Sequence, residues 1–222
     1  MGNQYHIKLE NYSLQKFKEN LKSREMIPSR VILKEDIDGR FAKLEKQHIT
    51  NLKELTDQLK TKPKLEKFSK DTGLSFEYIT ILNREAKSYI PKPIRIDKFA
   101  GIERNFVKKL ETMGLKNTRH ILEQAGKKDK REELAAKTGI PIEALNEILC
   151  LSDLSRAYGV GPVFARMIYD MGIKTIQEFV EKTAEDFIEI YEEQTNKKAD
   201  FGTNEIQFSI ELAKDLDILV EL

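Results

Sequence analysis

The feature of this 222-residue sequence that most limits its fold is an internal repeat. The segment Lys70–Phe76 aligns with Ala136–Ile142, and both contain the dipeptide Thr-Gly. Apolar residues coincide in the same alignment, without a gap: Leu44 with Leu110, Ile49 with Leu115, Ile79 with Leu145, and Leu82 with Ile148. A repeat with a fixed period indicates structural units that stack on one another.

A second, shorter offset adds a third copy of the unit. It aligns Gly101 with Gly159, and Met113–Lys116 with Met171–Lys174. We therefore expect four segments along the chain: an N-terminal helix and linker over residues 1–32, and three repeat units over residues 33–89, 90–153 and 154–222.

Proline marks the approach to the first two units. Ile27-Pro28 and Ile90-Pro91 are each followed by branched apolar residues, as in Val31-Ile32-Leu33. Because proline fixes its own φ angle and disfavours helix in the residue before it, these segments are predicted to be short extended linkers.

The punctuation within each unit is typical of short helices. Asn51, Asn117 or Thr118, and Thr175 are candidate helix N-caps, and Glu54 and Glu178 follow at the spacing of a capping box. Four glycines occupy positions where a left-handed residue would end a helix: Gly73, Gly114, Gly139 and Gly172. A further helix is expected over Asn11–Ser23. Outside Val31–Leu33 the sequence has no strand-like alternation, so the predicted fold class is all-α.

The third unit contains the most informative motif. Its segment Gly159-Val160-Gly161, with Ala165 four residues after the second glycine, resembles the helix-hairpin-helix motif. The whole chain resembles a bacterial family of tandem helix-hairpin-helix proteins, the domain of unknown function numbered 4332. The resemblance implies three tandem helix-hairpin-helix units, preceded here by the N-terminal helix, and no established activity.

In helix-hairpin-helix proteins the hairpin N–H groups and a nearby Lys or Arg hold the DNA backbone without reading its sequence. The matching positions here are Gly159, Val160, Gly161 and Arg166. An alternative for the glycines is purely structural, because they also allow two helices to pack closely.

The other copies depart from the motif. The second reads Gly101-Ile102-Glu103-Arg104, with a carboxylate in place of the second glycine, and the first has no glycine until Gly39. Basic residues still surround the second hairpin, and the candidate nucleic-acid contacts of this unit are Gly101, Arg104, Lys108 and Lys109. A solvated helix face is the alternative for these charges, because acidic residues intersperse them.

Charge and composition exclude several classes. Residues 154–222 carry 7 Lys and Arg against 14 Asp and Glu, and residues 1–153 carry a basic excess of about the same size. His6, His48 and His120 are far apart, and no nucleophile, phosphate-loop or paired-acid motif is present, so we expect no catalytic site, metal or cofactor. The lone Cys150 suits a reducing cytoplasm, and no apolar run reaches membrane length.

These observations predict a non-enzymatic, cytoplasmic accessory protein that binds double-stranded DNA independently of sequence. The alternative is a scaffold that binds another protein, with hairpins that are only structural. No membrane partner is expected.

Overall fold

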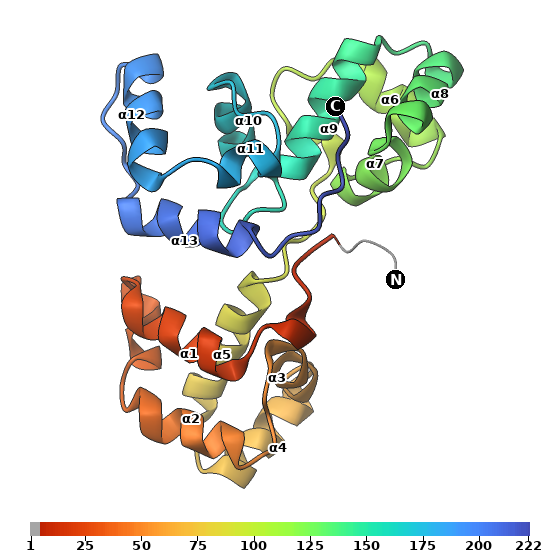
Figure 1. Cartoon of the computed structure of the whole chain (residues 1–222). Helices are drawn as coiled ribbons and strands as arrows, with labels where there is room; N and C mark the ends of the chain where they lie inside the picture. The colour runs from red at the N-terminus through yellow and green to blue at the C-terminus, as the bar shows by residue number, and fades with distance from the viewer. Residues whose placement is uncertain (1–4) are drawn as a thin grey trace. The chain divides into compact units, whose positions relative to one another are not determined.

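The computed structural model describes residues 5–222, and these residues form two compact units (Figure 1). One unit comprises Ile7–Ile90, and the other comprises residues 91–222 together with residues 5 and 6. Within the described residues every regular element is a helix, which confirms the all-α prediction.

The unit Ile7–Ile90 contains five α-helices and two 3₁₀ helices: η1 (Leu9–Asn11), α1 (Leu14–Ser23), η2 (Pro28–Leu33), α2 (Ile37–Glu45), α3 (Leu52–Gln58), α4 (Lys62–Thr72) and α5 (Phe76–Ser88). Its core is built around the ring of Phe17, which packs against the rings of Phe41 and Tyr89. The buried carboxylate of Glu85 on α5 pairs with Arg24 and Arg30, and so holds the segment after α1 onto α5.

The second unit contains η3 (Ile96–Lys98), α6 (Arg104–Thr112), α7 (Thr118–Ala125), α8 (Lys128–Thr138), α9 (Ile142–Leu154), α10 (Pro162–Asp170), α11 (Ile176–Val180), α12 (Ala184–Thr195) and α13 (Thr203–Ala213). Helix α9 is at its centre, because it packs against α7, α8, α10 and α11. Every residue from Ile148 to Leu154 is buried, as expected of a helix that neighbours surround.

The two sequence alignments reappear as correspondences between helices. The first alignment places the starts of α3, α4 and α5 on the starts of α7, α8 and α9: Leu52 on Thr118, Lys62 on Lys128, and Phe76 on Ile142. The second places Arg104, where α6 begins, on Pro162, where α10 begins. The segment boundaries at residues 33, 90 and 154, and the assignment of each copy as a helix-hairpin-helix, remain predictions.

The predicted helix ends are largely confirmed. The side chains of Asn51, Asn117 and Thr175 each accept a hydrogen bond from the backbone N–H three residues on, at 3.0, 3.1 and 3.2 Å. Glu54 and Glu178 do not close a box on the cap itself, because each accepts from the N–H of the residue before the cap.

The four glycines at predicted helix ends all have positive φ: 64° at Gly73, 79° at Gly114, 60° at Gly139 and 89° at Gly172. His48, which was not predicted, takes the same backbone conformation at φ 60° in the first copy, where it aligns with Gly114.

The prediction of an extended linker at Val31-Ile32-Leu33 is wrong, because these residues complete the 3₁₀ helix η2. Pro28 begins that helix, where its fixed φ favours a helical turn and its missing N–H removes no helical hydrogen bond. The helix expected over Asn11–Ser23 begins at Leu14, because the hydroxyl of Ser13 caps it by accepting from the Lys16 N–H at 3.0 Å.

Candidate nucleic-acid interface

The turn between α9 and α10 contains the predicted hairpin. Gly159 has φ 77°, a conformation that favours glycine. Val160 is buried, and its N–H donates to the carbonyl of Ala157 at 3.2 Å, so this N–H is used within the turn. Gly161 is the N-cap of α10, and the first helical residue is Pro162, which has no N–H to offer a ligand.

Gly161 has surroundings that do not explain why it is glycine. Its φ of −86° and ψ of −178° are open to any residue. A β-carbon added there, or at Gly159, would meet no atom within 4 Å. Close helix packing, the structural alternative for these two glycines, therefore has no counterpart in the described chain.

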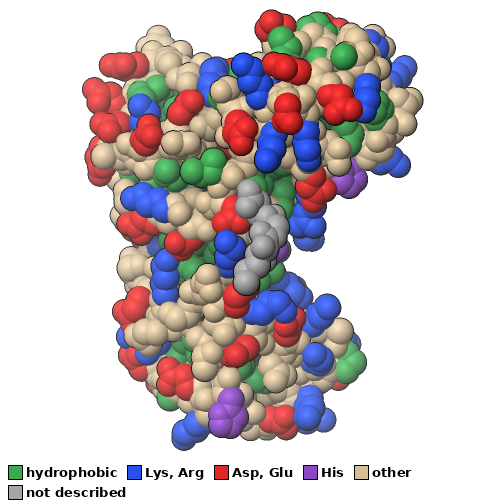
Figure 2. Space-filling view, turned by 45° about the vertical axis from the view of Figure 1, so that its right-hand side comes forward, with side chains coloured by type: hydrophobic (Ala, Val, Ile, Leu, Met, Phe, Trp, Pro, Cys, Tyr) green, Lys and Arg blue, Asp and Glu red, His purple; other side chains and the backbone are tan. Residues whose placement is uncertain are grey.

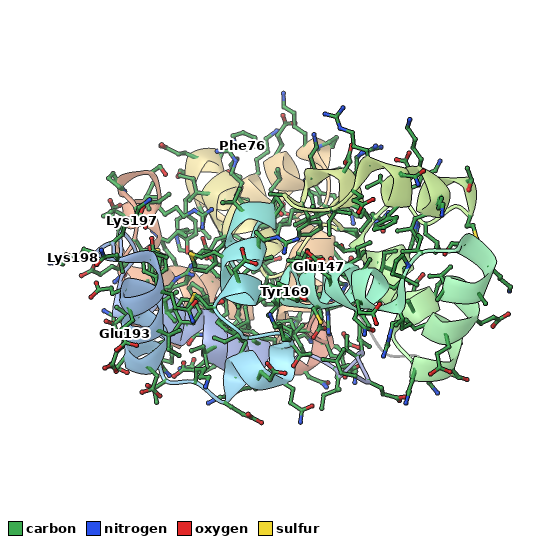
Figure 3. The ribbon with its side chains drawn as sticks, turned by 90° about the horizontal axis from the view of Figure 1, so that it is seen from above. Phe76, Glu147, Tyr169, Glu193, Lys197 and Lys198 are labelled. Atoms are coloured by element: carbon green, nitrogen blue, oxygen red, sulfur yellow. The ribbon has the colours of Figure 1, made fainter. Side chains whose placement is uncertain are left out.

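The guanidinium of Arg166 is turned toward carboxylates. It pairs with Glu147 on α9 at 2.5 Å and with Asp170 at 3.4 Å, and it lies over the ring of Tyr169 at 5.4 Å. Glu147 and Tyr169 are labelled in Figure 3. A β-carbon added at Gly101 would lie 3.2 Å from Nη2 of Arg166, so this side chain also covers the second hairpin. Its charge is thus largely balanced within the protein.

The second hairpin precedes α6. Gly101 has φ 83°, and Glu103 is the N-cap of α6 without a side-chain capping bond. Arg104 and Lys108 are exposed and lie one turn apart on this helix, so they share a face. Lys109 differs, because its ammonium donates to the carbonyl of Gly139 at 3.2 Å and so ties α6 to the end of α8.

Charges of both signs are mixed on the surface of the molecule. Figure 2 shows Lys and Arg side chains interspersed with Asp and Glu on the face that it presents. The ammonium of Lys174 lies 3.6 Å from the centre of the Tyr169 ring, and burial raises the pKa of the Tyr169 hydroxyl above its usual value.

Among the described residues, no three His, Cys, Asp or Glu side chains form a group that could hold a metal ion.

A buried ion pair, which was not predicted from the sequence, positions the third hairpin. Arg156, three residues before Gly159, is fully buried and donates to Oδ1 of Asp153 at 2.5 Å. The other oxygen of Asp153 accepts from the N–H of Ile176, the first residue of α11, at 2.9 Å. The pair therefore fastens the end of α9 to α11. An Asp and an Arg three residues apart at the end of an apolar helix were the available signal.

At the positions that align with Ile176, the first N–H of the helix donates to a main-chain carbonyl instead of a carboxylate. The N–H of Leu52, at the start of α3, donates to the carbonyl of Tyr12 at 3.0 Å, and the N–H of Thr118, at the start of α7, donates to that of Ile94 at 2.9 Å. In the third copy a carboxylate takes the place of the carbonyl. Burial raises the pKa of this Asp153 carboxyl, and Arg156 and the Ile176 N–H oppose the shift.

These helices and turns define an all-helical protein. The model of one family, the domain of unknown function DUF4332, matches residues 100–216, and the chain therefore belongs to this family. The matched part includes both hairpins and every helix from α6 to α13. No curated protein and no solved structure matched the chain. Of the helices described, none has the length and apolar character needed to cross a bilayer.

Proposed function

We propose that the protein is a non-enzymatic accessory protein that binds the phosphate backbone of double-stranded DNA without reading its sequence. The observation that supports this most is Gly161, which neither backbone angle nor internal packing requires. A glycine with no internal role leaves the backbone open to a group from outside. A phosphate suits this position, because the start of a helix attracts anions, although Val160 and Pro162 contribute no N–H to it.

The positive charge for this contact comes from α6, the helix that follows the second hairpin. Arg166 is already paired with two carboxylates, so it contributes less than its position in the motif implies. Arg104 and Lys108 are exposed on one face of α6, in the same compact unit. Such side chains hold phosphates at any sequence, because phosphates carry no sequence information.

The test is a binding titration of fluorescently labelled duplexes of two unrelated sequences, followed by anisotropy. Gly161→Val should weaken binding to both duplexes by the same factor, because the added side chain blocks approach of the backbone without disturbing the fold. Gly202→Val is the matched control: Gly202 is the N-cap of α13, has φ −89°, and has equally open surroundings. Equal affinities for wild type and Gly161→Val would refute the proposed contact.

A protein-interaction scaffold is the second candidate, and Val163 favours it. This side chain is 82% exposed at the second position of α10, directly beside the hairpin. On the DNA proposal, Val163→Lys adds a cation near the phosphate and tightens duplex binding. On the scaffold proposal, wild type and variant both fail to bind duplex DNA at low salt.

A further inference from the structure

The segment Asp217–Leu222, here called the strap, makes hydrogen bonds through its backbone. Nη2 of Arg156 donates to the carbonyl of Asp217, and Nη2 of Arg131 donates to the carbonyl of Glu221, each at 2.7 Å. The N–H of Glu221 donates in turn to the carbonyl of Gly126 at 3.0 Å. Bonds to main-chain atoms recognise an extended segment largely independently of its side chains.

The surface that receives the strap lies where α7 ends and α8 begins; it is here called the corner and consists of Ala125, Gly126 and Arg131. Arg131 is buried, and its Nη1 also donates to the carbonyl of Ala125 at 3.0 Å, so the guanidinium joins the end of α7 to the strap. Two buried arginines, Arg131 and Arg156, thus present donors to one extended segment.

Gly126 shapes the corner for close approach of a backbone. A β-carbon added there would lie 2.3 Å from the carbonyl oxygen of Leu219 in the strap, and 2.6 Å from that of Leu122. Such distances leave no room for any side chain, so glycine is required here by contact and not by its φ of −61°.

The strap places two of its four apolar side chains against the core, Val220 as a buried member and Leu219 as a partly buried neighbour. Val220 is 9% exposed, whereas Ile218 and Leu222 are 64% and 61% exposed. Segments with few buried apolar contacts open at low free energy while the rest of the fold persists. The family match ends at residue 216, so the corner belongs to the matched domain and the strap lies outside it.

The corner also holds a donor that the strap does not use. Nε of Arg131 is buried, and among the described residues it has no hydrogen-bond partner. A buried donor without an acceptor is unfavourable, so the strap satisfies the corner incompletely.

We propose that the corner is a binding site for an extended peptide segment, which the strap fills in cis and which the strap of a second copy fills when the first opens. The recognised features are backbone carbonyls and the apolar side chains at the positions of Leu219 and Val220. Exchange of an identical segment between copies is a known route to association of like chains.

Hydrogen exchange of the wild-type chain tests whether the strap opens. The amide of Glu221 should exchange about 100-fold faster than amides in the centre of α9, because it is released by local opening. Exchange of both at one common rate would overturn the proposal, since the strap would then open only when the whole unit unfolds.

Peptide binding tests whether the vacated corner is a site. The probe is a labelled synthetic peptide with the sequence of residues 215–222. Val220→Asp places a charge at the buried position of the strap and releases it, so this variant should bind the probe at least about tenfold more tightly than wild type. Leu222→Asp adds the same charge at an exposed position and should behave as wild type.

Adding Arg131→Lys to the Val220→Asp variant should weaken probe binding, because Nη2 of Arg131, the donor to the carbonyl of Glu221, is lost while the positive charge is kept. Failure of folded Val220→Asp to bind the probe would overturn the proposal. Loss of the helical spectrum in that variant would overturn it too, because the strap would then be an obligatory part of the fold.

Discussion

Replacing Arg156 by methionine should destabilise the unit of residues 91–222 more than any surface change. The guanidinium is fully buried and donates three hydrogen bonds: to the Asp153 carboxylate at 2.5 Å, to the Tyr5 carbonyl at 3.1 Å and to the Asp217 carbonyl at 2.7 Å. Removing one member of a buried ion pair typically costs about 3–5 kcal/mol, because the other charge stays buried without its partner.

Methionine keeps much of the apolar volume, so we expect a loss of about 4 kcal/mol in the free energy of unfolding. At roughly 4 °C per kcal/mol, the melting temperature of this unit should fall by roughly 15 °C. Urea unfolding followed by circular dichroism at 222 nm measures the change.

The pH dependence follows from the buried carboxyl. Burial already raises the pKa of Asp153, and without Arg156 its main opposing charge is gone. Above the usual pKa of 3.8, the unfolded chain has released the Asp153 proton, whereas the folded variant still holds it. The free energy of unfolding of the variant therefore falls as the pH rises from 3.8 toward the raised pKa of the folded state. The variant should consequently be closer to wild type at acidic pH than at pH 8.

A double variant isolates the ion pair. Asp153→Asn combined with Arg156→Met leaves no bare charge, and the Asn oxygen still accepts from the Ile176 N–H, so stability should recover by about 2 kcal/mol relative to Arg156→Met alone. A loss below about 1 kcal/mol for Arg156→Met, or simple additivity of the two changes, would refute this reasoning.

Three further outcomes are expected. Gly73→Val and Gly139→Val should each lower the free energy of unfolding by about 1–2 kcal/mol, because both glycines have positive φ; a shift of the urea midpoint in only one would contradict their equivalence. Asn117→Ala should cost about 1 kcal/mol through loss of the α7 cap, measured by thermal melting, and no change would mean that the cap is dispensable. Burial raises the pKa of the Cys150 thiol to about 12, so a maleimide at pH 8 should label it only after denaturation; rapid labelling of the folded chain would show that the site opens.

Much of the fold could be predicted because its signals are local. An N-cap such as Asn117 needs only the N–H three residues on, and a helix-ending glycine such as Gly139 needs only its own φ angle. The repeat offsets then carry each local signal from one copy to the next. The left-handed conformation of His48 could not be predicted, because a histidine in this conformation has no distinctive sequence pattern.

The candidate site was less predictable because its contacts are long-range. The motif assigns Arg166 to a phosphate, but the structure pairs it with Glu147, which belongs to the preceding helix. Lys109 similarly bonds to the carbonyl of Gly139, which lies at the end of a different helix. The positions of the charged residues in the sequence reveal neither of these partners. Only the structure distinguishes the exposed cations Arg104 and Lys108 from those that are bonded within the protein.

The most direct test of the proposed function is the salt dependence of duplex binding, measured by anisotropy with two unrelated sequences. We expect equal affinities for both duplexes and a linear fall of log K with log salt concentration. The double variant Arg104→Ala, Lys108→Ala should reduce the slope by about 1.8, which corresponds to two lost phosphate contacts. Absence of duplex binding by the wild type at low salt, or an unchanged slope in the folded double variant, would contradict the proposed DNA contact.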